Sequence, residues 1–211
     1  MQGCFITFEG VEGSGKSTQI ALLREWLESR GYPVTATREP GGSPVAEGVR
    51  NILLDPAMKG MAPAAELLLY TAARADHVAN VVRPALDNGR IVLCDRYVDS
   101  TIAYQGHARG LGESTIRRLH ALGVGNLWPV RTFLLDLAAE TGLERVRGRG
   151  RSDRLEQETL TFHARVRTAF LALGNAEPQR ITIVDGTMAV DAIATAIRRD
   201  VANLLEGCGA G

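Results

Sequence analysis

Lysine, cysteine and long hydrophobic runs are scarce in this chain of 211 residues, and the chain has no excess of charge. Lys16 and Lys59 are the only lysines, so 22 of the 24 basic residues are arginines, and 24 acidic residues balance them. Bulk nucleic-acid coat proteins and polybasic membrane binders draw their affinity from surplus basic residues. The balanced charge therefore excludes both classes, and we expect no nucleic acid and no membrane as a partner.

The three cysteines have neither the pairing of a disulfide scaffold nor metal-ligand spacing. Cys4 and Cys94 lie inside apolar segments and Cys208 lies in a glycine-rich tail, which is typical of reduced thiols. No stretch approaches the roughly 20 apolar residues of a membrane span. The first residues lack the basic region of a signal peptide. We therefore expect a cytoplasmic protein.

Short apolar runs alternate along the chain with longer stretches of helical period. Strands that are apolar on both faces and separated by helices indicate a parallel sheet with helices on either side. With 45% hydrophobic residues, we expect one α/β domain over residues 1–211, a doubly wound five-stranded sheet that binds its ligands at the carboxyl ends of the strands. The predicted strands are 4–8, 33–37, 91–94, 131–136 and 181–184. The predicted helices are 16–30, 44–54, 63–88, 99–106, 113–122, one from about 140, 155–174 and 190–205.

A phosphate-binding pattern follows the first predicted strand. Residues 10–17 read Gly-Val-Glu-Gly-Ser-Gly-Lys-Ser and fit G-x-x-x-x-G-K-[ST] between a strand and a helix, the context that this P-loop requires. The glycines let backbone N–H groups surround phosphates, Lys16 reaches the outer phosphates and the Ser17 hydroxyl can coordinate Mg²⁺. We assign nucleotide binding to Gly10, Val11, Glu12, Gly13, Ser14, Gly15, Lys16, Ser17 and Thr18.

A P-loop alone does not decide whether the phosphoryl group passes to water or to an acceptor. The chain has no N-K-x-D motif of the GTPase type, and it is too short for the extra modules of a helicase or transporter ATPase. Basic and aromatic residues instead follow the second and third strands, where a second substrate would bind.

An ordered set of motifs resembles the thymidylate kinase family over residues 1 to about 205. It comprises the P-loop, Thr37-Arg-Glu-Pro-Gly-Gly42, Ala72-Ala-Arg74, Asp95-Arg-Tyr97, Ser100-Thr-Ile-Ala-Tyr-Gln105 and an arginine-rich segment at 145–154. The resemblance implies a P-loop kinase that transfers the γ-phosphoryl group of ATP to dTMP, with Mg²⁺, in dTTP synthesis. It also implies a homodimer.

The resemblance implies roles for two arginines and one aspartate around the phosphates. Arg38 and Arg96 would clamp the dTMP phosphate, for which bidentate guanidinium contacts are chemically suited. Asp95 would help to place Mg²⁺, directly or through water, together with Ser17. Because the acceptor oxygen is already ionised, positioning and charge neutralisation can carry most of the chemistry, and we identify no general base.

Further residues are implied around the nucleoside. Tyr70 would stack on thymine in place of the more usual Phe, and Arg74, four residues on, would bind the carbonyl edge of the base. Without the resemblance, a core aromatic and a surface ion pair are the alternatives for these two residues. The other implied residues are Thr101 and Gln105 around base and sugar, Tyr104 where a ribose 2′-OH would intrude, and Glu12 as acceptor for the 3′-OH.

The arginine-rich segment resembles the lid of the family members that supply a catalytic arginine from the lid, since the P-loop here contains none. Gly148 and Gly150 would permit a hinge, although a solvated charge run is the usual alternative. The resemblance implies that a lid at about 141–154 closes over ATP and brings Arg149 to the transferred phosphoryl group. Arg147 and Arg151 would contact ATP, and Arg154 is a further candidate.

The adenine pocket has only candidate residues, and the histidines have no assigned role. Asp185-Gly-Thr187 and Arg180 are candidates for the adenine pocket, with a turn and a surface residue as the alternatives. The histidines show no ligand spacing, and we assign no role to any of them: His77, His107, His120 and His163.

Two other functions fit parts of the pattern. Another pyrimidine nucleoside monophosphate kinase, acting on UMP or CMP, would have a base pocket around Arg74, Thr101 and Gln105 that accepts an amino group at C4. A P-loop NTPase switch would use Asp95-Arg-Tyr97 only as a Walker-B-like element.

Overall fold

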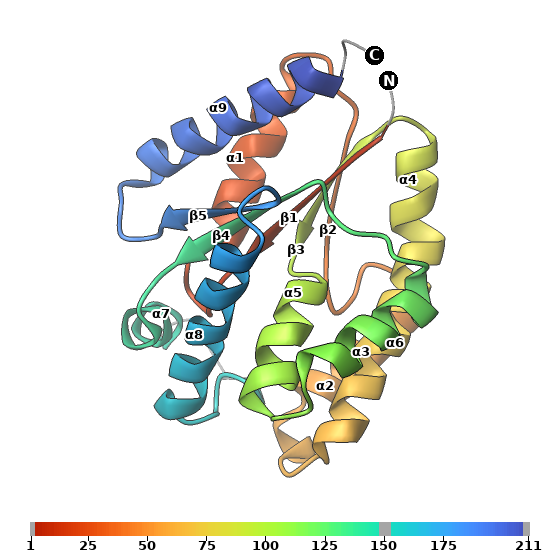
Figure 1. The fold of residues 1–211 in the computed structure, drawn as a ribbon, viewed down its shortest axis with the longest axis vertical. Helices are drawn as coiled ribbons and strands as arrows, with labels where there is room; N and C mark the ends of the chain where they lie inside the picture. The colour runs from red at the N-terminus through yellow and green to blue at the C-terminus, as the bar shows by residue number, and fades with distance from the viewer. Residues whose placement is uncertain (1–2, 148–152, 209–211) are drawn as a thin grey trace.

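Five parallel strands form the centre of the molecule (Figure 1), as the computed structural model shows for residues 3–147 and 153–208. Their order in the sheet is β2-β3-β1-β4-β5, and every neighbouring pair is parallel. The predicted sheet is confirmed, and each strand begins and ends within one residue of its predicted bounds. The strands are β1 (Cys4–Glu9), β2 (Val34–Arg38), β3 (Ile91–Asp95), β4 (Arg131–Asp136) and β5 (Ile181–Asp185).

The helices follow the predicted pattern with two interruptions by π-helical turns, but α8 begins at Leu160 and not at 155, because residues 154–157 form a turn held by the Asp153 side chain. Pro44 and Pro63 occupy first helical positions, where their missing N–H is no loss, and the Thr159 side chain accepts a hydrogen bond from the Phe162 N–H to cap α8. The helical elements are α1 (Lys16–Glu28), α2 (Pro44–Leu54), η1 (Pro56–Met58), α3 (Pro63–His77), η2 (Val78–Val82), α4 (Arg83–Asp87), α5 (Val98–Thr101), η3 (Ile102–Ala108), α6 (Glu113–Val124), α7 (Ala139–Val146), α8 (Leu160–Ala176) and α9 (Val190–Cys208).

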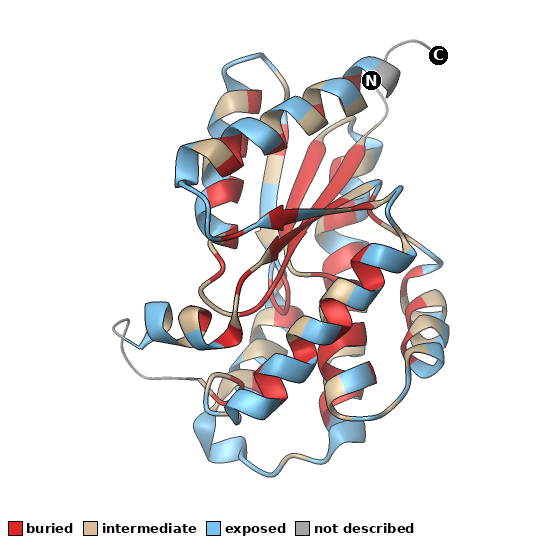
Figure 2. Cartoon of the chain, turned by 60° about the vertical axis from the view of Figure 1, so that its left-hand side comes forward, coloured by how far each residue is buried: buried red, intermediate tan, exposed pale blue. Residues whose placement is uncertain are grey.

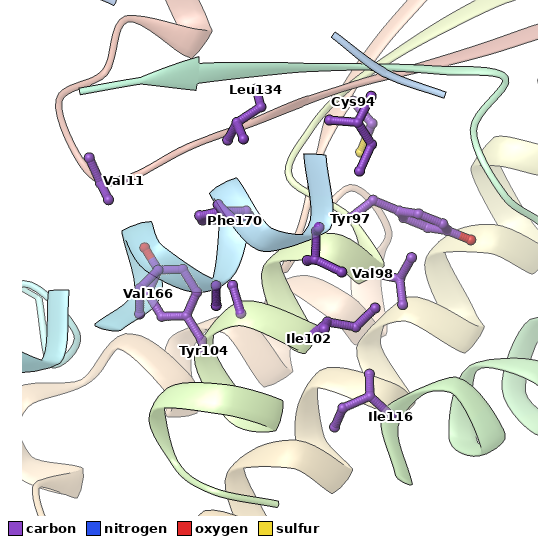
Figure 3. Packing of buried hydrophobic residues seen from close by; sticks show 14 of the residues in the cluster. Val11, Cys94, Tyr97, Val98, Ile102, Tyr104, Ile116, Leu134, Val166 and Phe170 are labelled. Carbon is purple, nitrogen blue, oxygen red and sulfur yellow. The ribbon is translucent and has the colours of Figure 1, made fainter. Parts of the chain in front are cut away.

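Alternate residues of the central strands enter two separate cores. Ile6 and Phe8 pack toward α1 and α9 on one face, whereas Phe5 packs toward the helices of the other face, which include α5, η3, α6 and α8. The central strands β1, β3 and β4 are therefore buried on both sides (Figure 2), whereas the edge strands β2 and β5 are partly exposed. Figure 3 shows the second core, where Tyr97 and Phe170 pack among aliphatic side chains. Within residues 3–147 and 153–208, no helix has the length and apolar character of a membrane span.

The strand order decides where ligands can bind. β1 lies between β3 and β4, so the chain leaves it in one direction toward β2 and β3 and later crosses to β4 on its other side. Asp95 pairs with Phe8 on one side and with Arg38 on the other, so the carboxyl ends of three strands lie level. The P-loop, the Arg38 loop and the Asp95 turn therefore meet at one edge. β1 begins and α9 ends at the opposite edge (Figure 1).

Candidate active site

A cavity of about 370 Å³ opens at the carboxyl edge of the sheet. Every residue that the sequence assigned to the acceptor nucleotide lines it, although the residues come from the P-loop, β2, α3, the turn after β3, α5 and η3. Lys16, Ser17 and Asp95 line the same cavity, so the donor and acceptor regions are continuous. The acceptor residues in the lining are Glu12, Arg38, Tyr70, Arg74, Arg96, Thr101, Tyr104 and Gln105.

The P-loop conformation depends on left-handed glycines. Gly13 has φ 69° and Gly15, which precedes α1, has φ 99°, a region that residues with a Cβ adopt at a cost. The Lys16 ammonium donates to the carbonyl oxygens of Gly10 (3.1 Å) and Val11 (2.9 Å). Burial and the nearby guanidinium of Arg96 lower the pKa of Lys16 to about 8. An arriving phosphate would therefore meet a buried cation held only by neutral acceptors.

Ser17 and Asp95 form the pair with the chemistry of a magnesium site. The Ser17 hydroxyl donates a hydrogen bond to Asp95 Oδ2 at 2.9 Å, and both side chains line the cavity. Mg²⁺ prefers oxygen ligands and takes only one or two from a protein, completing its shell with waters and substrate phosphates. The pair fits that pattern. The part of the chain that the structure describes has no group of three or more His, Cys, Asp or Glu residues able to hold a metal.

Arg96 occupies a left-handed backbone conformation, with φ 69°, directly after β3. Its guanidinium donates to Gly10 O (3.0 Å) and lies 3.1 Å from Glu12 Oε1. Burial opposes its charge, but Tyr104, Glu12 and other acidic groups outweigh burial and raise its pKa. A non-glycine residue in such a conformation is costly and is typical of functional sites. Arg96 is therefore a fixed, permanently charged donor beside the P-loop.

The turn that carries Arg96 is held by Glu9, a residue that the sequence analysis did not single out. Glu9 Oε1 accepts the Tyr97 N–H at 2.7 Å, and Oε2 accepts the Ser100 hydroxyl at 2.5 Å. Burial and the neighbouring Asp99 raise the pKa of Glu9 to about 8. This buried carboxyl group positions the turn through these two hydrogen bonds, and it is not one of the residues that line the cavity.

Glu12 is held by residues from three elements. Its Oε1 accepts the Tyr104 hydroxyl at 2.6 Å and the Arg96 guanidinium at 3.1 Å. Its Oε2 lies 3.2 Å from His163 Nδ1 on α8. Burial opposes the charge of Glu12, but Arg96 and His163 outweigh it and keep the pKa of Glu12 well below its usual range. Glu12 is therefore an ionised acceptor among phosphate-binding groups.

Arg74 lies in a buried network and not in the surface ion pair that was its alternative. Its Nε donates to Glu39 Oε2 at 2.7 Å and its Nη2 donates to Thr101 Oγ1 at 2.8 Å. Glu39 Oε1 lies 2.9 Å from His77 Nδ1, and the other nitrogen of that ring lies 2.7 Å from Thr37 Oγ1. Glu39 and His77 were not predicted from the sequence; the only signal was that Glu39 lies inside the Thr37–Gly42 motif.

Tyr70 and Arg38 line the cavity, and each keeps part of its surface exposed. Tyr70 is half-buried in its wall, and burial raises the pKa of its hydroxyl. Arg38 is half-exposed, and its Nη2 contacts both oxygens of Glu47, at 2.8 and 3.0 Å. Glu47 also accepts the Gly42 N–H at 2.8 Å. A phosphate could compete with this exposed partner for Arg38.

The buried carboxylate of Glu66 links Gln105 to Arg154 at the end of the arginine-rich segment. Glu66 Oε1 accepts the Gln105 amide at 2.8 Å, and Oε2 lies 2.6 Å from Arg154 Nη1 and 3.2 Å from Arg109 Nη2. Burial opposes the charge of Glu66, but these donors outweigh it and lower its pKa. Arg154 is buried and donates its Nε to Leu53 O, so in this structure its guanidinium is held by Leu53 and Glu66.

Helix α7, where the predicted lid begins, rests directly on the P-loop. A Cβ added at Gly142 would lie 2.2 Å from Glu12 O, and one added at Gly13 would lie 2.2 Å from Gly142 O. Arg145 also donates to Gly13 O at 3.3 Å. Arg147 is exposed at the end of α7. The predicted arginines Arg149 and Arg151 lie outside the described residues.

The two adenine candidates have local partners. Asp185 accepts the backbone N–H and the hydroxyl of Thr187, at 2.8 and 2.6 Å, in a turn after β5. The Arg180 guanidinium is bound bidentately to Asp99, at 2.7 and 2.9 Å, beneath the Trp128 ring. Arg180 is therefore a partly buried partner of Asp99 and is not one of the residues that line the cavity.

A family model described as thymidylate kinase matches residues 8–197. A thymidylate kinase of Syntrophotalea carbinolica is 51% identical over 208 residues, covering 96% of each chain. One of Geotalea uraniireducens is 50% identical over 212 residues, covering 97% of this chain and 100% of that one. The crystal structure of a thymidylate kinase from Ehrlichia chaffeensis matches with a TM-score of 0.79 at 32% identity, covering 95% of this chain and 100% of that one.

Proposed function

This chain belongs to the thymidylate kinase family, and from that premise we propose that it transfers the γ-phosphoryl group of ATP to dTMP, giving dTDP and ADP in dTTP synthesis. One observation carries the proposal: all the acceptor residues assigned from the sequence line one cavity that runs into the P-loop. A water-directed NTPase has no use for such a pocket.

The phosphate end of the acceptor lies beside Arg96 and Arg38. Arg96 donates to Gly10 O, so an anion on its free edge would lie next to the phosphates in the P-loop. Arg38 would exchange Glu47 for the same phosphate. Two guanidinium groups then neutralise the acceptor, whose ionised oxygen attacks without a general base. Their role is to hold two anions end to end.

The nucleoside end would fill the pocket around Tyr70 and Arg74. The Tyr70 ring offers a stacking surface for thymine, and Arg74 is held against Glu39 and Thr101 with its charge directed along the pocket wall. Gln105 lies beside the base. Tyr104, bound to Glu12 at 2.6 Å, closes the space for a 2′-hydroxyl, which favours deoxyribose. Glu12 would accept the 3′-hydroxyl.

On the donor side, the P-loop backbone and Lys16 would bind the ATP phosphates, and Ser17 and Asp95 would hold Mg²⁺. The ion, when bound, neutralises charge on the phosphates. The described side chains then orient the ATP phosphates. The Ser17 hydroxyl is held next to Asp95, with 2.9 Å between Oγ and Oδ2. Lys16 leaves its carbonyl partners and binds the outer phosphates.

The lid assignment rests on the sequence. We keep Arg149 as the catalytic arginine and Arg147 and Arg151 as ATP contacts. Arg147 ends the helix that rests on the P-loop, which supports an approach of this segment to ATP. We also keep a single kinase domain over residues 1–211, with the lid at about 141–154, and a cytoplasmic location.

A homodimer is the proposed assembly. Leu68 on α3 and Leu122 on α6 are 58% and 84% exposed, and these two helices pack against each other. A second copy would cover this face. Sedimentation equilibrium tests it: Leu122→Glu should shift the protein to monomers, whereas Leu160→Glu on α8, also exposed, should leave the dimer intact. A wild-type monomer would refute it.

The activity is tested by following ADP formation from ATP and Mg²⁺ with dTMP, dUMP, UMP, CMP, AMP or no acceptor. We expect the highest kcat/KM with dTMP, at least about 100-fold above that with UMP or CMP, because a site with placed polar partners rejects a mismatched base edge strongly. Turnover without acceptor would indicate an NTPase, and a preference for UMP or CMP would overturn the substrate assignment.

A further inference from the structure

His163 is a buried histidine that the mechanism above does not use. It lies in the first turn of α8, has no exposed surface, and approaches Glu12 of the P-loop. Its Nδ1 is 3.2 Å from Glu12 Oε2. Among the described residues neither ring nitrogen has an aligned hydrogen-bond partner, and neither has Glu12 Oε2, so the 3.2 Å contact is a close polar contact without full hydrogen-bond alignment.

Burying polar atoms without partners is costly, so such atoms are rare in folded proteins. His163 Nδ1 and Glu12 Oε2 are both buried and lie 3.2 Å apart, within hydrogen-bond distance, so a small rotation of the ring or of the carboxylate lets each satisfy the other. The Nδ1–H tautomer of the imidazole then donates to Oε2. The contact between His163 and Glu12 therefore joins α8 to the P-loop.

The two oxygens of Glu12 have different surroundings. Oε1 is bound by Tyr104 at 2.6 Å and by Arg96 at 3.1 Å, and both of these residues line the cavity. Oε2 is shielded from solvent on the α8 side. The Glu12 side chain keeps 12% of its surface exposed, which leaves Oε1 as the oxygen on the cavity side. Oε2 can thus act as the anchor of the carboxylate.

We propose that His163 is a positioning residue: its Nδ1–H holds Oε2 of Glu12, which keeps the carboxylate plane fixed so that Oε1 can accept the 3′-hydroxyl of the acceptor nucleotide. This inference rests on the proposed function, because it assumes a deoxynucleotide in the cavity. His163 itself touches no substrate atom. Without its contact, the carboxylate could rotate about its last bond and lose its alignment with the hydroxyl.

The test compares dTMP with its 3′-deoxy analogue, which lacks the hydroxyl. His163→Phe keeps a ring and removes the donor, and we expect it to raise KM for dTMP about tenfold while kcat changes less than about threefold. KM for the 3′-deoxy analogue and for ATP should remain near the wild-type values. His163→Asn returns an N–H close to the position of Nδ1 and should restore much of the preference for dTMP. A role in stability alone would affect both acceptors equally.

The matched control is His120→Phe. His120 is also a buried histidine, and its Nε2 lies 3.0 Å from Leu127 O on the far side of Tyr97. This variant should leave the ratio of the two KM values unchanged. The inference is wrong if His163→Phe alters both acceptors equally or neither, or if the wild type does not distinguish them. If His163→Phe does not fold, a KM ratio for His163→Ala equal to that of the wild type overturns it. A wild type without dTMP kinase activity would refute the proposed function instead.

Discussion

The Ser17 hydroxyl donates a hydrogen bond to Asp95 Oδ2 at 2.9 Å, although the two residues are 78 positions apart in the sequence. The contact joins the first turn of α1 to the end of β3. It places one hydroxyl and one carboxylate where both can face a nucleotide in the P-loop, and these are the oxygen ligands that Mg²⁺ prefers.

Replacement of Asp95 by Asn should weaken Mg²⁺ binding at this pair. The amide keeps the shape but loses the negative charge, so we expect the Mg²⁺ concentration for half-maximal activity to rise at least about tenfold. The measurement is ADP formation against Mg²⁺ at constant ATP, and Mg²⁺-dependent binding of ATP gives a second readout. Asp87→Asn, exposed at the end of α4, is the control. An unchanged Mg²⁺ dependence would remove Asp95 from the metal site.

The pKa of Lys16 predicts a pH dependence of nucleotide binding. In the free protein burial lowers it to about 8, and a bound phosphate favours the ammonium and raises it again. Above pH 8, binding must therefore take up a proton, and affinity should fall by up to about tenfold per pH unit. The ATP phosphates do not contribute, because the last pKa of a phosphate group is about 6. Calorimetry of ATP binding without Mg²⁺ measures the affinity at each pH, and the affinity of Lys16→Met should not fall above pH 8. An affinity independent of pH would contradict it.

Arg149→Ala tests the lid assignment. A charge that stabilises only the transferred phosphoryl group lowers kcat and kcat/KM together, and such arginines contribute about 10³-fold or more in related transferases. We expect kcat to fall well beyond tenfold, with little change in KM for dTMP. Arg165→Ala, an exposed arginine of α8, is the matched control. A loss smaller than about tenfold, or about 1.4 kcal/mol of barrier, would rule Arg149 out.

Gly142 should be intolerant of a methyl group. Its added Cβ would lie 2.2 Å from the Glu12 carbonyl oxygen, so Gly142→Ala must displace either α7 or the P-loop. We expect ATP affinity to fall at least about tenfold, or about 1.4 kcal/mol. Gly48→Ala is the control, because Gly48 is also helical and an added Cβ meets nothing within 4 Å. Equal binding by both variants would show that α7 does not position the P-loop.

Glu66 should be more important for stability than any exposed carboxylate. Breaking a buried ion pair leaves an uncompensated charge, so Glu66→Gln, which leaves Arg154 without its anion, should lower the free energy of unfolding by about 3 kcal/mol or more. Urea denaturation measures the change. Glu28→Gln removes the exposed pair with Arg24 and should cost less than about 0.5 kcal/mol. Similar losses for both variants would contradict the difference in burial.

The sequence predicted the sheet well for a physical reason. Strands buried on both faces are short apolar runs between turn residues, and that pattern is local. The helices were harder to bound: the predicted helix at 63–88 contains the π-helical turn η2, because the apolar spacing continues through it. The predicted helix at 99–106 likewise runs into the π-helical turn η3, which carries Tyr104 and Gln105.

Contacts between distant charges were outside the reach of the sequence. Arg74 was assigned from its motif, but its buried partner Glu39 was not, since nothing local shows which face of a loop turns inward. His163 was assigned no role because the residue it meets lies 151 positions earlier in the chain, on the P-loop. Arg180 was a candidate for adenine binding, and only the tertiary fold pairs it with Asp99.

The positions of the two ends of the fold have a practical consequence. β1 begins and α9 ends at the edge of the sheet opposite the cavity, so a peptide that joined them would cross only the far side of the molecule. Circular permutants with such a linker, reopened between α6 and β4, should retain the nucleotide pockets. For the same reason, either end can carry an affinity tag or a surface tether while substrates enter and leave at the other edge.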